Sequence, residues 1–160
     1  PMSARRQRQM CIRDRLTTGN IDEKKIYAIK PLTFMNNSGT AIKELIDYFK
    51  IDAKDVFVFH DDMDIDFGKI KAKFGGSSAG HNGIESIDKF IGKDYSRVRI
   101  GIGHPKQKKK VNNHVLEDFK EDEEEKINEI TENIVKQLPT LIDKKIDLFS
   151  SKVNQDLNGI

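Results

Sequence analysis

The pattern of apolar and polar positions predicts strands and helices that alternate along the chain. Strands are enriched in β-branched and aromatic residues, and a half-exposed strand alternates apolar and polar side chains. Four segments fit this description: residues 25–30, 56–59, 69–74 and 97–103. In residues 69–74 a lysine stands at every second position, which predicts a strand with one basic face.

Apolar residues that recur every three or four positions predict helices over residues 41–49, 84–91 and 122–138. Pro139 is expected to end the third helix, because proline cannot donate the backbone hydrogen bond of a helix interior. A final helix is expected over residues 141–149. Because strands and helices are interleaved, the chain is predicted to fold as an α/β layered domain.

The length of 160 residues suits one domain with its own core. The formal net charge of +2 comes from residues 1–15, since the rest of the chain holds 23 basic and 25 acidic residues. Whole-chain charge is therefore no argument for nucleic-acid binding. Residues 1–15 show no apolar periodicity, and we interpret them as a foreign or disordered leader. A basic arm that binds RNA is the alternative.

Cysteine usage and hydropathy restrict the compartment. The single cysteine, Cys11, excludes a disulfide framework and a zinc site built from cysteines, which fits a reducing cytoplasm. No run of residues is apolar enough to span a membrane, and no secretory signal is visible. We therefore expect a cytoplasmic protein without a membrane partner.

Polar side chains follow three of the apolar segments and are candidates for a shared site. They are Asn36, His60 with Asp61, and His81 with Asn82. Ligands of open α/β sheets bind beyond the carboxyl ends of the strands. Amide groups there can hold a peptide or a sugar, and a carboxylate can orient an imidazole that activates water.

Each of these residues also has a purely structural interpretation. Asn36 can serve as a turn or cap residue, and Asn82 stands three positions before Glu85, the spacing of a capping box. Phe34 can be a core residue. The lysines of residues 69–74 can be a solvated strand face.

A metal site is a further alternative in the same stretch. His60, Asp61 and Asp64 offer nitrogen and oxygen ligands. Their spacing matches no strong metal motif, and no pair of histidines at helical spacing supports one. We therefore expect neither a metal nor a cofactor.

Taken together, three segments resemble bacterial peptidyl-tRNA hydrolase: KPLTFMNNSG at residues 30–39, VFVFHDDMDIDFGKIKAKFGGSSAGHNGI at 56–84, and RVRIGIGHP at 97–105. They occur in the order and spacing of that family. The resemblance implies a single α/β domain with a twisted mixed β-sheet sandwiched between helices. It also implies metal-free hydrolysis of the ester that joins a peptide to the 3′ end of tRNA, by a monomer whose partner is peptidyl-tRNA.

The resemblance also implies roles for individual residues. Asp61 matches the aspartate that holds the catalytic histidine, and Asn36 and Asn82 match amides that bind the substrate near the ester. Phe34 matches a residue that contacts the same end of the substrate. Phosphate contacts are predicted by pattern rather than by motif at Lys73, Arg99 and Lys108.

The general-base histidine of the family has no match in this sequence. In the family it stands in an Arg-His-Asn-type motif, after a first strand and a glycine-rich loop, and nothing in residues 1–25 resembles these features. The histidines present stand in other motifs: His60, His81, His104 and His114.

We therefore expect an N-terminally truncated member of the family that is deficient in catalysis. The predicted organisation is a leader (1–15), a hydrolase-like domain that lacks its first strand and helix (16–150) and a frayed tail (151–160). A non-catalytic RNA-binding module of the same fold is the alternative.

Overall fold

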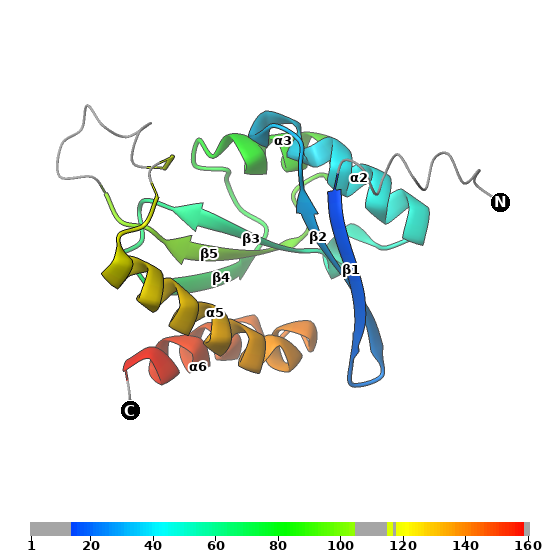
Figure 1. The fold of residues 1–160 in the computed structure, drawn as a ribbon. Helices are drawn as coiled ribbons and strands as arrows, with labels where there is room; N and C mark the ends of the chain where they lie inside the picture. Colours follow the sequence, from blue (N-terminus) through cyan, green and yellow to red (C-terminus); the bar gives the residue numbers. More distant parts are fainter. Residues whose placement is uncertain (1–13, 105–114, 117, 159–160) are drawn as a thin grey trace. The chain divides into compact units, whose positions relative to one another are not determined.

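The computed structural model describes residues 14–104, 115–116 and 118–158 (Figure 1). The described residues form two compact units. The first comprises residues up to Val56 together with Gly75–Tyr95, and the second comprises Phe57–Phe74 together with residues from Ser96 onward. None of the described helices is long and apolar enough to cross a membrane.

The first unit begins with a β-hairpin. Strands β1 (Asp14–Ile21) and β2 (Lys24–Pro31) pair antiparallel along their whole length. β2 is the strand predicted over residues 25–30. β1 was not predicted, because its mixed polar sequence carries little strand signal and its backbone is held by the pairing with β2. It begins at residue 14, within the segment interpreted as a leader.

Two helices complete the first unit. The 3-10 turn η1 (Met35–Asn37) leads into α2 (Ser38–Phe49), and the 3-10 turn η2 (Ala53–Asp55) follows. Helix α3 (Asn82–Ile91) packs against α2. Both helices bury the apolar stripes expected from the sequence: Ala41, Ile42, Leu45 and Ile46 on α2, and Ile84 and Ile87 on α3.

The two helices touch at Gly39 and Ser86. The backbone N–H of Gly39 donates to Ser86 Oγ at 3.0 Å. A Cβ atom at position 39 would meet the backbone carbonyl of Ser86, so no other residue fits there without a shift of the helices. The close crossing fixes α2 and, through it, the η1 turn relative to α3.

The second unit contains a mixed sheet. Strands β3 (Phe57–Asp62), β4 (Ile70–Phe74) and β5 (Ser96–Gly101) are ordered β3-β5-β4. The central strand β5 runs parallel to β3 and antiparallel to β4. Strand β3 extends further than the apolar run that predicted it. Its charged end stays within the strand because it pairs with residues 99–101 of β5.

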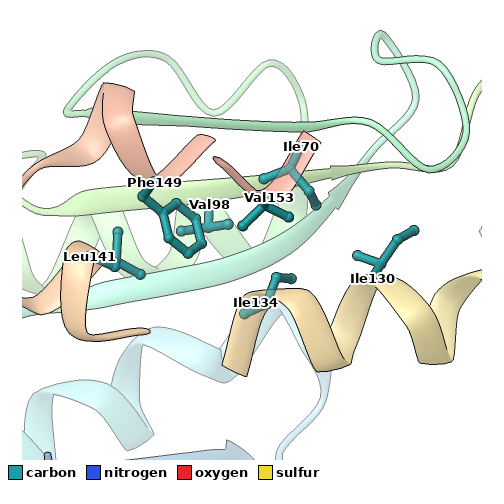
Figure 2. Packing of buried hydrophobic residues seen from close by; sticks show 7 residues of the cluster. All are labelled: Ile70, Val98, Ile130, Ile134, Leu141, Phe149 and Val153. Carbon is teal, nitrogen blue, oxygen red and sulfur yellow. The ribbon is translucent and has the colours of Figure 1, made fainter. Parts of the chain in front are cut away.

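Two helices supply the rest of the core of this unit. They are α5 (Glu121–Ile142) and α6 (Ile146–Asn158). Figure 2 shows their apolar side chains packed with those of β4 and β5. The buried cluster consists of Ile70, Val98, Ile130, Ile134, Leu141, Phe149 and Val153. The apolar face of β4 and β5 and the stripe of α5 that the sequence predicted therefore meet in one core.

The proline in α5 does not end the helix where the sequence predicts. Helix α5 continues past Pro139 to Ile142, and the backbone N–H of Asp143 still donates to Pro139 O at 3.0 Å. Proline removes a single donor here, close to the end of the helix. The helix stops before Lys144, whose φ of 62° lies in the left-handed region.

Helix α6 runs through the segment expected to fray, from residue 151 onward. Phe149 and Val153 are fully buried. Two polar side chains of the helix, Ser150 and Asn154, accept hydrogen bonds at 2.9 Å from backbone N–H groups of β4. These contacts hold the helix in place as far as Asn158, which explains the difference from the expectation.

Candidate functional site

The two predicted substrate amides lie where η1 meets the start of α3, in the first unit. A Cβ atom on Gly83 would lie 2.5 Å from Met35 Sδ, so the glycine allows the turn and the helix to approach. Asn36 follows Met35 and Asn82 precedes Gly83 in the sequence. The structure therefore brings two segments of the chain that carry predicted site residues to the same part of the unit.

Asn82 is not part of a capping box, which was its structural interpretation. The N-cap of α3 is His81, whose Nδ1 accepts hydrogen bonds from the backbone N–H groups of Gly83 at 3.1 Å and Ile84 at 3.3 Å. Asn82 is the first residue of the helix and is exposed. Because His81 serves as the cap, the amide of Asn82 is not needed for that purpose.

Phe34 is not a core residue, because 84% of it is exposed. Leu32 and Met35 are also more than half exposed, so three apolar side chains close to Asn36 in the sequence are exposed to solvent. Asn36 itself lies in the η1 turn, as its structural interpretation predicts, and is exposed. An exposed amide beside exposed apolar side chains is suited to a ligand with both polar and apolar parts.

Asp61, the predicted partner of a catalytic histidine, lies on β3 in the second unit and is half-buried. The adjacent His60 places its Nδ1 2.7 Å from the backbone oxygen of Asp61. The amides of Asn36 and Asn82 belong to the other unit, so the prediction that they share a pocket with Asp61 stays a prediction.

The acidic turn after β3 is organised by hydrogen bonds. Asp62 Oδ1 accepts from the backbone N–H of Asp64 at 2.9 Å, and Asp64 Oδ1 lies 2.9 Å from His104 Nε2. Within the described ranges, no group of three His, Cys, Asp or Glu side chains is arranged to hold a metal ion. His60, Asp61 and Asp64 are therefore not gathered as a metal centre in the structure.

The second unit has a basic pocket of about 390 Å³. Lys73 and Arg99, two of the residues predicted to contact phosphate, both line it; Lys108 lies outside the described residues. Lys71, Ser150 and Ser151 also line the pocket. Such side chains favour an anionic ligand, although the carboxylate of Asp147 also lines the pocket.

Sequence reasoning missed the role of Asp62 in this pocket. Asp62 is only 8% exposed, and its Oδ2 accepts from Arg99 Nε at 2.7 Å. Burial alone raises the pKa of the Asp62 carboxyl. The hydrogen bonds from Arg99 and from the backbone of Asp64 outweigh that effect, so the pKa lies below its ordinary value of 3.8.

The signal for Asp62 was hidden in a run of acidic residues. Asp61, Asp62 and Asp64 look alike in the sequence, and only the pairing of β3 with β5 shows which of them reaches Arg99. Ser150 and Ser151 were missed for another reason, because they stand where the last predicted helix ends and the segment expected to fray begins.

The fold and the site define an α/β protein with two exposed amide-bearing segments and a pocket lined by basic side chains. A family model described as peptidyl-tRNA hydrolase matches residues 2–159. The chain belongs to the peptidyl-tRNA hydrolase family, whose members are hydrolases.

Relatives in several bacteria support this assignment. The peptidyl-tRNA hydrolase of Pelagibacter ubique is 73% identical over 139 residues, which cover 87% of this chain and 75% of that protein. The peptidyl-tRNA hydrolase of Aliarcobacter butzleri is 47% identical over 123 residues, which cover 77% of this chain and 67% of that protein. Both identities are high enough to show from the sequence alone that the chain belongs to the family.

Solved structures confirm the predicted fold class. A crystal structure of peptidyl-tRNA hydrolase from Acinetobacter baumannii matches with a TM-score of 0.78 and 27% identity, covering 92% of this chain and 81% of that one. An Arg119Gln mutant of the enzyme from the same organism matches with a TM-score of 0.82 and 28% identity, covering 90% and 74%. The α/β fold with a mixed sheet is therefore that of the family.

Proposed function

We propose that this protein binds peptidyl-tRNA and takes part in hydrolysis of the ester between the peptide and the tRNA. The observation that supports the proposal is the close approach of Met35 to Gly83, which are the sequence neighbours of Asn36 and Asn82, in a chain of the peptidyl-tRNA hydrolase family. The exposed apolar side chains at and next to Phe34 can contact the terminal nucleobase of the tRNA or side chains of the peptide.

In this proposal each side chain has a chemical task. Asn36 and Asn82 hydrogen-bond to the substrate near the scissile ester, and Phe34 contacts the same end. Asp61 matches the residue that orients a general-base imidazole in the family, although no histidine of this chain stands in the motif that supplies that imidazole. No metal and no cofactor take part.

The phosphates of tRNA are assigned to the basic pocket of the second unit. Lys73 and Arg99 line it, and Lys108 is proposed from the sequence as a further phosphate contact. Lysine and arginine contacts to phosphate release counterions, so binding should weaken as salt rises. We further propose that the protein acts as a monomer in the cytoplasm. Sedimentation of the purified protein would report its mass and so test the monomer.

The catalytic step itself is expected to be slow in these 160 residues. None of their histidines stands in the motif that carries the general base of the family. Loss of a catalytic base commonly costs several orders of magnitude in rate. We therefore propose that the chain binds its substrate far better than it turns it over.

Turnover and binding of an N-acylated aminoacyl-tRNA test the proposal. We expect tight binding with little hydrolysis, and we expect Asn36→Ala and Asn82→Ala to weaken binding of the acylated tRNA more than of the deacylated tRNA. Turnover at the rate of an enzyme that carries the Arg-His-Asn-type motif would contradict the deficiency and would point to His60 or His81 as the base. Addition of a strong chelator should change neither measurement.

A non-catalytic RNA-binding module is the second candidate, and the basic pocket favours it. Such a module should bind acylated and deacylated tRNA with equal affinity, and it should do so as a stably folded protein. Unequal affinities that become equal in Asn36→Ala would therefore support the hydrolase site. A thermal melt without a cooperative transition would count against the module.

A further inference from the structure

The polar face of the sheet in the second unit concentrates positive charge. Arg99 on β5 stands in register with Lys71 on β4, and the next polar-face pair is Arg97 with Lys73. On its other side Arg99 is in register with His60 of β3. Like charges on directly opposed positions of neighbouring strands repel, so these side chains tend to move apart unless a counter-charge holds them.

Asp62 provides that counter-charge, and its own position is fixed. One carboxylate oxygen accepts from the backbone N–H of Asp64 at 2.9 Å, and the other accepts from Arg99 Nε at 2.7 Å. The carboxylate is almost completely buried, whereas the Arg99 side chain keeps 21% of its surface exposed where it lines the pocket. The ion pair therefore joins the fixed carboxylate of Asp62 to the guanidinium of Arg99, which still reaches the pocket.

We propose that Asp62 is a positioning residue for RNA binding, which fixes the guanidinium of Arg99 through Nε so that its terminal N–H groups can bind a phosphate in the pocket. The inference rests on the proposed function of that pocket. An arginine side chain has five N–H donors, and the bond to Asp62 uses the one on Nε.

The bond to Asp62 orders the Arg99 side chain before RNA binds. A long side chain that is free in solution loses rotamer freedom when it binds a phosphate, and a side chain that is already held loses less. Asp62 also offsets the repulsion between Arg99 and Lys71. Its pKa is lowered, so the carboxylate is ionised at neutral pH and the pair is intact under binding conditions.

A double-mutant cycle on the full chain tests the proposal, with tRNA binding measured over a range of salt concentrations. The variants are Asp62→Asn, Arg99→Gln and the double variant. In asparagine an NH2 donor replaces one of the two accepting oxygens, and the negative charge that holds Arg99 is lost. Asp156→Asn is the matched control, because it removes one negative charge and one ion pair of the same unit, with Lys136, outside the pocket lining.

We expect Arg99→Gln to weaken tRNA binding roughly tenfold and to reduce the slope of log affinity against log salt by about 1. Asp62→Asn should reproduce most of both effects, and the double variant should be no weaker than Arg99→Gln alone. The control should bind like the parent chain. A merely structural role for Asp62 would leave the salt slope of Asp62→Asn unchanged, even though the variant melts at a lower temperature.

Two results would overturn the inference in different ways. If Arg99→Gln weakens binding but Asp62→Asn does not, Asp62 has no positioning role and the pocket remains an RNA contact. If Arg99→Gln and Lys73→Gln both bind normally, the pocket does not contact RNA and the inference falls with it, while membership of the hydrolase family stands.

Arg99→Lys is the second variant, to be measured if Asp62→Asn does not fold. This variant keeps a cation beside Asp62 but replaces the planar guanidinium by a point charge. We expect it to fold and to bind tRNA more weakly, with a reduced salt slope. Binding equal to that of the parent chain would overturn the proposal.

Discussion

The side-chain amide of Asn154 pairs with the backbone of Ile70 as a neighbouring strand would. Ile70 N–H donates to Asn154 Oδ1 at 2.9 Å, and Asn154 Nδ2 donates to Ile70 O at 2.8 Å. Ser150, one turn earlier on α6, accepts from Ala72 N–H at 2.9 Å. The outer edge of β4 is thus covered by a helix, which satisfies its backbone groups and blocks pairing with another strand.

Asn154→Ala should therefore destabilise the protein. The substitution leaves the N–H and the carbonyl of Ile70 without these partners in a partly buried place, and we expect a loss of about 1–3 kcal/mol in the free energy of unfolding. Urea denaturation measures the loss. Asn128→Ala, on an exposed position of α5, is the matched control and should change stability little. Equal effects of the two changes would show that the edge contact contributes nothing.

Gly39→Ala should separate α2 from α3. The added methyl group would meet the backbone carbonyl of Ser86, and backbone cannot move as a side chain can. We expect a cost of about 1–3 kcal/mol in the free energy of unfolding. Weaker binding of acylated tRNA should accompany it, because this crossing fixes the η1 turn. Gly19→Ala, which meets no atom within 4 Å, is the control. Full stability of Gly39→Ala would mean that the helices are not tightly packed at this point.

His81→Ala should loosen the start of α3. The Nδ1 atom of His81 satisfies two backbone N–H groups of the first turn, and removal of an N-cap costs about 1 kcal/mol. His81→Asn should restore most of the lost stability, because asparagine is a good N-cap residue. A thermal melt of the three proteins decides the question. If the asparagine variant is as unstable as the alanine variant, the imidazole acts through packing and not as a cap.

Asp62 should make stability depend on pH in the acid range. Its pKa is lowered in the folded state relative to the usual 3.8, chiefly because its bonds to Arg99 and Asp64 outweigh burial, and the charge of His60 acts in the same direction. The unfolded chain therefore binds more protons, so this contribution to stability is full above pH 3.8 and is lost as the pH falls through the lower folded pKa.

Urea denaturation at several pH values checks this expectation. The difference in unfolding free energy between the parent chain and Asp62→Asn should be largest near neutral pH and should shrink below pH 3.8. Asp156→Asn is a useful comparison, because the pKa of Asp156 is also lowered by its hydrogen bond to Lys136. That pair is exposed, so high salt should remove its effect but leave most of the effect of the buried Asp62. A difference for Asp62→Asn that is constant with pH would contradict the assignment.

Local sequence patterns predicted most of the regular structure. Strand β4 alternates lysines with apolar residues, and α5 repeats isoleucines at helical spacing, so each segment shows which face it buries. The candidate amides were also found from the sequence, since Asn36 and Asn82 stand in short motifs that resemble those of one family.

The tertiary structure decided which distant segments pair, hydrogen-bond or form ion pairs with one another. Strand β1 forms because β2 pairs with it, and α6 persists beyond residue 150 because Asn154 meets Ile70, which is 84 positions away. Asp62 could not be told apart from Asp61 until the pairing of β3 with β5 placed it beside Arg99. A residue's own neighbours in the sequence set its preferred backbone and its polarity. Hydrogen bonds and ion pairs between remote segments leave no periodic mark in the sequence, and so they become visible only in the folded chain.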